Sequence, residues 1–299
     1  MRSVHENNNG FTLIELMISV AIFAVVMGAA YSLLTSQSKT YTSQMAVVDT
    51  QQDLRAGMEL LVRDFRLAGY DECIGDSADA GFAVASATRV TLTMSIHDGI
   101  DGDGDTIVDE WDEAGSIAFD GIDNDGDGEV DGYSELTWAA VSPSINQAEE
   151  TVIYGFSASD DADDDGIADI GAAPFGRTDG AGVFNVLMDN IRAVAFAYAF
   201  DDDLDGFLDV DAGGDVIWAV DSENDQDLNV DLGGNAVNPN IELDRIRSVR
   251  IWVLARTSRE SRDFVDNQTY TVGSADIVPG DGFRHRLMTS TVLCKNMDL

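Results

Sequence analysis

An uncharged apolar stretch near the N-terminus constrains this chain more than any other feature. Residues 16–34 contain no charged side chain, and an uncharged run of this length is about what a helix needs to cross a bilayer. Glu15 stands at its head, after a short polar leader, residues 1–10. A secretory signal has its cleavage site after the apolar segment, whereas here the turn-prone Asn-Asn-Asn-Gly comes before it. We therefore expect cleavage after Gly10, which would leave the apolar helix on the mature chain, beginning at Phe11.

Residues 10–15, GFTLIE, followed by an apolar helix resemble the prepilin signature of type IV pilins and type II secretion pseudopilins. The resemblance implies that a prepilin peptidase cuts after Gly10 and methylates the new N-terminus at Phe11. It implies a single-pass protein of the bacterial inner membrane, with its head in the periplasm, that later enters a pilus at the cell surface. Its partners would be other pilins and minor pilins, held through the N-terminal helix.

Glu15 has a physical role in this interpretation. A carboxylate at membrane depth is costly unless it is paired, and the α-amino group of Phe11 in a neighbouring subunit is the natural partner. The alternative is an ordinary signal anchor in which Glu15 is a solitary interfacial residue.

The helical pattern continues beyond the apolar stretch. One apolar stripe recurs at steps of three and four residues, which is typical of an amphipathic helix; its members are Val47, Gln51, Leu54, Met58, Leu61 and Phe65. The first proline is Pro143, so nothing forces a break between Phe11 and about Arg66. We expect one long helix, with a membrane or filament-core half at 11–36 and an amphipathic half at 37–70.

Alternating apolar residues predict strands in the rest of the chain, at 90–96, 135–141, 151–156, 194–200, 249–253 and 287–293. Period-two segments separated by Gly/Asp loops indicate a mainly antiparallel sheet. The predicted fold class is therefore α+β, with a head at 71–299 wrapped on the amphipathic half of the helix and acidic loops inserted into it.

Four short segments extend the family resemblance into the head. Residues 65–70 (FRLAGY), 189–191 (DNI), the strand 249–254 and the closing 291–296 (TVLCKN) resemble the PilW branch of minor pilins. This implies a protein that helps to prime pilus assembly at or near the tip. A type II secretion pseudopilin and a calcium-dependent adhesin that uses residues 98–131 and 201–231 are the alternatives.

The net charge of −38 is concentrated in three stretches. Residues 98–131, 160–169 and 201–231 hold 32 of the 55 acidic residues and no Lys or Arg. Such a distribution argues against a nucleic-acid partner. The rest of the chain has an ordinary balance of acidic and basic residues, so the excess negative charge belongs to the three acidic stretches.

The acidic stretches follow the spacing of EF-hand-like calcium loops. Carboxylates stand at positions 1, 3, 5 and 9, with glycine at 6 for a sharp turn. Three copies fit fully: Asp123, Asp125, Asp127 and Asp131; Asp161, Asp163, Asp165 and Asp169; Asp201, Asp203, Asp205 and Asp209. Two lack the glycine: Asp101, Asp103, Asp105 and Asp109; Glu223, Asp225, Asp227 and Asp231. We expect Ca²⁺ as the ligand.

An apolar residue at position 8 of each copy could anchor the loop to the core; these are Val108, Val130, Ala168, Leu208 and Val230. Asp101 and Asp123 are 22 residues apart, as are Asp201 and Glu223, which suggests two loop pairs. A position-12 ligand is mostly missing, so we expect the modest affinity of extracellular modules. The alternative is a set of solvated acidic loops that need no ion.

The two cysteines, Cys73 and Cys294, do not form a CxxC pair, and with three histidines they cannot assemble a zinc set. In an oxidising compartment they could form one bridge between the end of the helix and the C-terminal strand; the alternative is two separate thiols. No catalytic constellation occurs in the sequence, so we expect a protein that is not an enzyme.

Overall fold

The structure is a computed structural model that describes residues 12–69, 81–93, 151–178, 182–221, 227–237, 241–261 and 264–297. The chain divides into two compact units, Met1–Asp49 and Thr50–Leu299. The expected strand at 135–141 lies outside the described residues.

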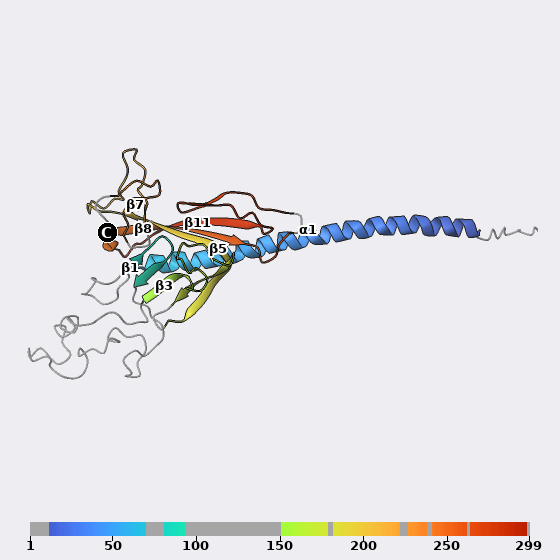
Figure 1. Ribbon diagram of the computed structural model, residues 1–299, viewed down its shortest axis with the longest axis horizontal. Helices are drawn as coiled ribbons and strands as arrows, with labels where there is room; N and C mark the ends of the chain where they lie inside the picture. Colours follow the sequence, from blue (N-terminus) through green and yellow to red (C-terminus); the bar gives the residue numbers. More distant parts are fainter. Residues whose placement is uncertain are drawn as a thin grey trace, which may run out of the picture. The chain divides into compact units, whose positions relative to one another are not determined.

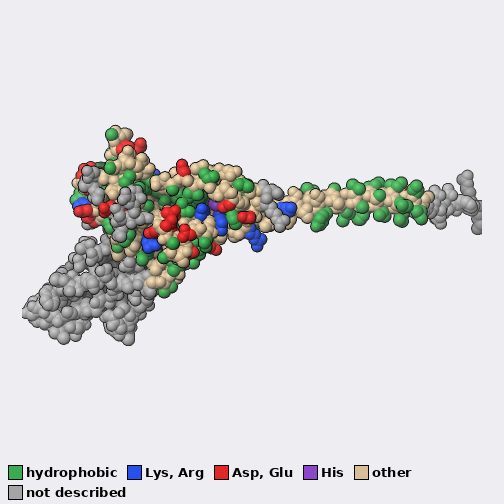
Figure 2. Space-filling model, in the orientation of Figure 1, with side chains coloured by type: hydrophobic (Ala, Val, Ile, Leu, Met, Phe, Trp, Pro, Cys, Tyr) green, Lys and Arg blue, Asp and Glu red, His purple; other side chains and the backbone are tan. Residues whose placement is uncertain are grey.

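One unbroken helix, α1 (Leu13–Leu67), runs through both units, as the absence of proline predicts. In the first unit its apolar side chains face outward, and Figure 2 shows them along the visible face of this segment. An 18-residue window of α1 has a mean hydropathy of 2.4 and none of it is buried. In the described part of the chain, α1 is the single helix long and apolar enough to cross a membrane.

The second half of α1 supplies one side of the core of the second unit. Leu54, Met58, Leu61 and Phe65 are buried, so the predicted stripe is confirmed at these positions. The ring of Phe65 lies 5.7–6.3 Å from three aromatic rings of the sheet, those of Phe82, Tyr154 and Phe196. Aromatic rings at this separation add to the free energy gained from burial.

The described strands of the second unit form an antiparallel sheet on α1 (Figure 1). Strands β9 and β10 form a separate two-stranded hairpin. The sheet has nine strands, in the order β1-β2-β3-β4-β5-β6-β7, with β8 paired to β5 and β11 paired to β8. Their bounds are β1 Gly81–Ala85, β2 Val90–Thr93, β3 Thr151–Phe156, β4 Ala173–Thr178, β5 Phe184–Phe200, β6 Ala219–Val220, β7 Val230–Asp231, β8 Ile246–Arg256, β9 Tyr270–Val272, β10 Ala275–Ile277 and β11 His285–Leu293, with a short 3₁₀ helix, η2 Leu243–Arg245, before β8.

The second half of strand β5 is buried on both of its faces. Its aromatic side, including Phe196 and Tyr198, belongs to the core against α1. Its alanines belong to a second core, where Trp218, Trp252 and Tyr270 cover them. The sequence predicts the alternation in 194–200, but this second layer, built from the loops after β5 and the β9–β10 hairpin, was not predicted.

Two glycines allow close approach to the helix. A Cβ on Gly57 would lie 2.0 Å from Cγ of Met188 in β5, so the Met188 side chain packs directly on the helix backbone here. Gly69 ends the helix with φ +74°, a conformation that favours glycine. A Cβ there would lie 2.8 Å from Sδ of Met297, and the side-chain amide of Asn296 donates a hydrogen bond to the carbonyl of Arg66 at 3.1 Å.

The predicted α+β class is confirmed. The strand expected at 151–156 has the bounds of β3, and those at 90–96, 194–200, 249–253 and 287–293 fall on β2, β5, β8 and β11. The strands β1, β4, β6, β7, β9 and β10 and the first half of β5 were not predicted.

Candidate functional site

The helix begins with a reciprocal cap. Oε2 of Glu15 accepts hydrogen bonds from the backbone N–H of Thr12 at 3.0 Å and from its hydroxyl at 2.8 Å. In return, the Thr12 hydroxyl accepts from the Glu15 N–H at 3.4 Å. This is a capping box, Thr-x-x-Glu, and sequence reasoning missed it although the pattern is visible in GFTLIE. Gly10 and Phe11, the residues of the expected cleavage, lie outside the described part of the chain.

The Asp161 loop gathers three carboxylates around one point. Oxygen atoms of Asp161, Asp163 and Asp165 all lie within 4.8 Å of one another. The two oxygens of Asp161 accept the backbone N–H groups of Asp165 and Gly166, at 3.1 and 3.0 Å. Asp169, at position 9, accepts the N–H of Ala162 at 3.0 Å. The predicted carboxylates at positions 1, 3 and 5 are therefore brought together.

The Asp201 loop repeats this geometry. Oxygens of Asp201, Asp203 and Asp205 again lie within 4.8 Å of one another. Asp201 accepts from the N–H groups at positions 5 and 6 at 3.2 and 3.0 Å, and Asp209 accepts from position 2 at 3.1 Å. Both loops have a left-handed residue at position 4 and a left-handed glycine at position 6; these are Asp164, Gly166, Leu204 and Gly206. The two loops thus adopt the same backbone conformation.

The two loops are fastened differently. Gly166 lies directly against β5, because a Cβ there would lie 2.6 Å from the carbonyl oxygen of Val194. Asp164 accepts a hydrogen bond from Thr88 at 3.3 Å and lies 3.7 Å from the Arg89 guanidinium, and Ala168, at position 8, is buried in the core. The Asp161 loop is therefore part of the fold.

The Asp201 loop is held mainly at its two ends. Its position-8 residue, Leu208, packs against the second core, so the expected apolar anchor is present. However, Leu204 is 60% exposed and Phe207 is 76% exposed. A Cβ on Gly206 would meet no atom within 4 Å. This loop therefore presents two large apolar side chains to solvent.

The electrostatics of both loops favour a cation. Burial, only partly offset by the N–H groups of Gly166 and Asp165, raises the pKa of Asp161 to about 6, and burial likewise raises the pKa of Asp209. Carboxylates that repel one another hold protons more tightly, and a bound divalent ion relieves this repulsion. Oxygen ligands at positions 1, 3 and 5 suit a hard cation such as Ca²⁺.

The spacing suggests that Asp231 stands at position 9 of an acidic loop, but its hydrogen bonds are those of a turn. It accepts the N–H groups of Gly233 and Asn235 at 2.8 and 2.7 Å, as Asp211 accepts those of Gly213 and Asp215 at 2.8 and 3.0 Å. The Asn235 side chain, followed by its backbone N–H, lowers the pKa of Asp231.

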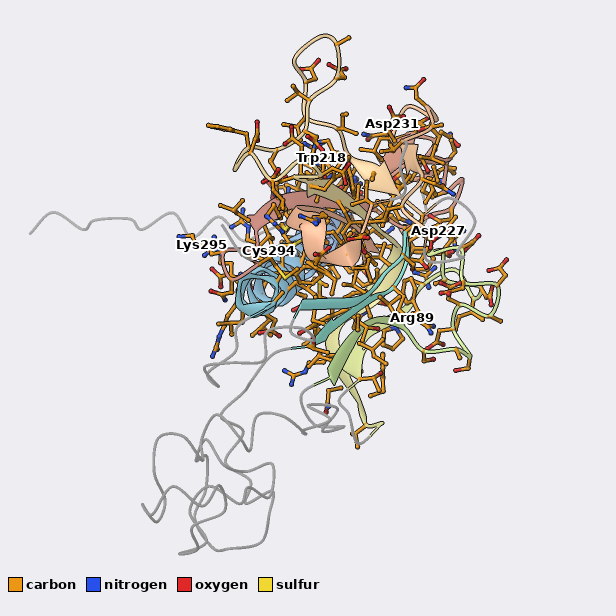
Figure 3. The ribbon with its side chains drawn as sticks, turned by 90° about the vertical axis from the view of Figure 1, so that its left-hand side faces the viewer. Arg89, Trp218, Asp227, Asp231, Cys294 and Lys295 are labelled. Carbon is orange, nitrogen blue, oxygen red and sulfur yellow. The ribbon has the colours of Figure 1, made fainter. Side chains whose placement is uncertain are left out.

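Backbone hydrogen bonds also align the loop around Asp231 with the loop around Asp211. Ile217 donates to the carbonyl of Asp209, and Val237 donates to that of Asn229. The repeat therefore has an offset of 20 residues rather than 22, so Asp231 matches Asp211, and Asn229 stands at position 9. The same offset matches Asp221, which is buried, to Asp201, whereas Glu223 lies outside the described residues. Asp227 and Asp231 are labelled in Figure 3.

Several expected site residues lie outside the described ranges. These are Asp101, Asp103, Asp105, Asp109, Asp123, Asp125, Asp127, Asp131, Glu223, Asp225 and Cys73. Cys294 is described and buried, and burial raises the pKa of its thiol to about 12. Figure 3 shows Cys294 beside α1.

Comparisons with known proteins agree on two segments. Residues 6–31 match the family model of the prokaryotic N-terminal methylation motif, and residues 161–296 match that of the type IV pilus-assembly protein W. No curated protein is significantly similar to the chain. A solved type IV-like pilin from Thermus thermophilus is 14% identical with a TM-score of 0.38, over 83% of this chain and 97% of that one. This likeness is too low to support an argument, so the two family models are the basis of the assignment.

Proposed function

Because this chain is a minor type IV pilin of the PilW type that takes part in pilus assembly, we propose that it is cut after Gly10 and methylated on Phe11. The helix that follows anchors it first in the bacterial inner membrane, with its head in the periplasm, and later packs against other pilins. The unbroken α1 and its exposed apolar side chains support this proposal. We place the protein at or near the pilus tip, in a structural role rather than an enzymatic one.

N-terminal sequencing of the chain extracted from membranes tests the processing step. The expected N-terminus is a methylated Phe11, and a Gly10→Val variant should keep its leader. A Thr12→Ser variant, which retains a hydroxyl for the helix cap, serves as the matched control. An intact leader on the unaltered chain, or a cut beyond Leu34, would contradict the proposal.

For the acidic loops we propose Ca²⁺ as the stabilising ligand of the head. The observation that supports this is the twofold occurrence of one arrangement, three carboxylates within 4.8 Å of one another, at Asp161 and at Asp201. The ion would occupy the point on which these oxygens converge. Asp163 and Asp165, and likewise Asp203 and Asp205, are exposed, so solvent water can complete the coordination.

Calcium titration of the full chain in detergent tests this assignment. Replacing Asp163 and Asp165 with Asn should remove one bound ion, and replacing Asp203 and Asp205 should remove another. Mg²⁺ should bind much more weakly, because it demands near-ideal octahedral geometry. Unchanged stoichiometry in both variants would leave these stretches as solvated acidic loops.

A second candidate function, calcium-dependent adhesion, is favoured by the exposed apolar residues of the Asp201 loop. Leucine is unusual in the left-handed conformation that Leu204 adopts, with φ +57°. The matched residue of the other loop, Asp164, is polar, and its position-7 residue, Ile167, packs on the second core instead of facing solvent. A contact surface would explain the difference. Exchanging Leu204 for Asp and Phe207 for Ser should then reduce adhesion and leave the number of pili unchanged.

We also propose that Cys73 and Cys294 form a bridge. Cys294 follows β11, and its neighbour Asn296 contacts the last turn of α1, only a few residues before Cys73. Closing so long a loop could contribute on the order of 4 kcal/mol in the chain-entropy model. Mass spectrometry of a non-reduced digest should show the two peptides linked, and two free thiols would contradict the proposal.

A further inference from the structure

A buried histidine lies at the opposite end of the sheet from the Asp201 loop. The Asp201 loop follows Phe200, which pairs with Ile246 at the start of β8, whereas His285 pairs with Arg256 at the end of β8. The His285 side chain is fully buried. Residues 257–284, which connect β8 to β11, bring Asp266 and Asp281 to its two ring nitrogens.

Asp266 fixes the orientation of the imidazole. Oδ2 of Asp266 lies 3.2 Å from Nδ1 of His285 and accepts the backbone N–H of the same residue at 3.2 Å. It also accepts the hydroxyl of Tyr270 at 3.0 Å, and Oδ1 accepts the N–H of Gln268 at 3.2 Å. Hydrogen bonds that converge on a carboxylate in this way favour its ionised form. An ionised carboxylate only accepts hydrogen bonds, so Nδ1 of His285 is the nitrogen that has the proton.

Nε2 of His285 is then left with its lone pair. In the neutral imidazole, the nitrogen that lacks the proton can only accept a hydrogen bond. Among the described residues no group donates a hydrogen bond to Nε2, and the atom that it faces is Oδ2 of Asp281 at 3.8 Å. Two acceptors thus lie opposite each other, and the buried one, Nε2 of His285, is costly to leave without a donor or a cation.

We propose that Nε2 of His285 and Oδ2 of Asp281 are two ligands of a first-row transition-metal ion of the Zn²⁺ class. Zinc bonds to imidazole nitrogen and carboxylate oxygen are each about 2.0–2.2 Å long, so two ligands 3.8 Å apart can bind one ion at an obtuse angle. A bridging water would lie about 2.8 Å from each of the two atoms. Because these atoms are only 3.8 Å apart, the angle at the water oxygen would be smaller than the H–O–H angle of water. A nitrogen donor also separates this site from the oxygen-only calcium loops.

Asp266 has the place of the outer carboxylate that orients a metal-binding imidazole. The Asp281 side chain is 29% exposed, so an ion can enter from solvent, and water fills the remaining coordination positions. Arg256 also lies close enough to act on His285, and its charge opposes a cation. Arg286, which donates to the carbonyl of His285 at 3.4 Å, adds a second positive charge, so the carboxylates of Asp266 and Asp281 about balance the two guanidinium groups.

Cobalt(II) is a suitable probe, because ligand-field absorption reports its coordination. The full chain in detergent is first saturated with Ca²⁺, so that the acidic loops are filled, and is then titrated with Co²⁺. The expected result is one equivalent of Co²⁺ in a low-symmetry site, displaced by Zn²⁺. Asp281→Asn and His285→Asn should each weaken binding at least tenfold. Asp276→Asn, a carboxylate of the same connection whose partner is Thr271, is the matched control and should bind normally.

Asp266→Asn tests the positioning role and should weaken Co²⁺ binding about tenfold to a hundredfold. Since His285→Asn can disturb folding, the partly exposed Asp281 is the decisive position. Co²⁺ binding that is equal in Asp281→Asn and the unaltered chain overturns the proposal, as does no binding beyond the calcium loops. A metal-free His285 ring that is doubly protonated at pH 7, shown by its nitrogen chemical shifts, would also overturn it, because the proton would then occupy the place of the ion.

Discussion

Tyr154 of β3 donates a hydrogen bond from its hydroxyl to Oδ2 of Asp64 in α1 and so joins the sheet to the helix. Tyr154 is fully buried, and Nη1 of Arg177 lies 3.8 Å from the same carboxylate oxygen. Burial, followed by the charge of Asp64, raises the pKa of Tyr154 well above its ordinary value. The hydroxyl therefore keeps its proton and remains a donor at every pH that the protein meets.

Removing this hydroxyl should destabilise the head. Tyr154→Phe leaves the ring in the core but takes the donor from Asp64, and hydrogen bonds to charged groups contribute about 1.5–3 kcal/mol. We expect the free energy of unfolding in urea to fall by about that amount. Tyr41→Phe, at an exposed position of the same helix, should change nothing. Equal unfolding midpoints for Tyr154→Phe and the unaltered chain would contradict the expectation.

Gly57→Ala should destabilise the head although alanine is the better helix former. The new Cβ would lie 2.0 Å from Cγ and 2.5 Å from Sδ of Met188, and Met188 is buried with little room to move. Overpacking of this kind costs about 1–3 kcal/mol, which exceeds the propensity gain of about 1 kcal/mol. In a Met188→Ala background the same change should no longer destabilise. Gly28→Ala, where no atom lies within 4 Å, is the control in the helix.

Two substitutions at Glu15 separate its charge from its helix cap. Glu15→Gln can still cap the helix through Thr12 but cannot pair with a neighbour's amine, whereas Glu15→Ala loses both interactions. If pairing with Phe11 governs assembly, both variants should be processed normally and both should be depleted in sheared pili. Normal incorporation of Glu15→Gln alone would show that the cap, rather than the charge, is what assembly needs.

Calcium should raise the melting temperature of the full chain in detergent. Binding to the folded state alone stabilises by about 2.7 kcal/mol per site at a hundredfold excess over Kd. Asp161→Asn should remove more of this gain than Asp201→Asn, because the Asp161 loop is packed into the sheet and the Asp201 loop can open locally. Asp189→Asn, an exposed acid outside both loops, is the control. A melting temperature that responds to neither calcium nor chelator would rule out the mechanism.

Without calcium, Asp161 should make the protein less stable as the pH rises. Its pKa of about 6 in the folded state lies above the ordinary value of 3.8, so the folded state holds the proton more tightly. The stabilisation that this gives is full below pH of about 4 and is lost as the pH rises through about 6. In chelator, the urea midpoint of the unaltered chain should therefore fall relative to Asp161→Asn over this range. Calcium should reverse the trend, because it binds the carboxylate form.

The sequence predicts those parts of the fold in which a single periodicity decides the outcome. The stripe from Leu54 to Phe65 and the strand at 151–156 are of this kind. Strand β4 was missed because its sequence, APFGRT, has no alternation; there Gly176 is needed by contact, since a Cβ would lie 2.5 Å from the carbonyl oxygen of Asn185. The alanines of β5 look like spacers, and only the tertiary structure shows that tryptophans pack on them.

The acidic loops, too, were predicted only in part from the sequence. Carboxylates at every second position predicted that Asp161, Asp163 and Asp165 converge. Around residues 221–231, however, acids at alternate positions fit the loop pattern in two registers, and spacing alone cannot choose between them. The Gly-Gly turns after Asp211 and Asp231 make the choice in the structure. Asp266 and Asp281 were not predicted as partners of His285, because the long connection that brings them together has no periodic pattern.

The contact between the end of α1 and the last residues of the chain has a consequence for the timing of folding. Arg66 and Gly69 meet Asn296 and Met297, so the earliest and the latest segments of the head are neighbours. Contacts so distant in sequence form slowly, because the long stretch of chain between them must close first. The end of α1 therefore stays uncovered until Asn296 and Met297 have folded onto it, and a chain truncated before Asn296 would lack this contact.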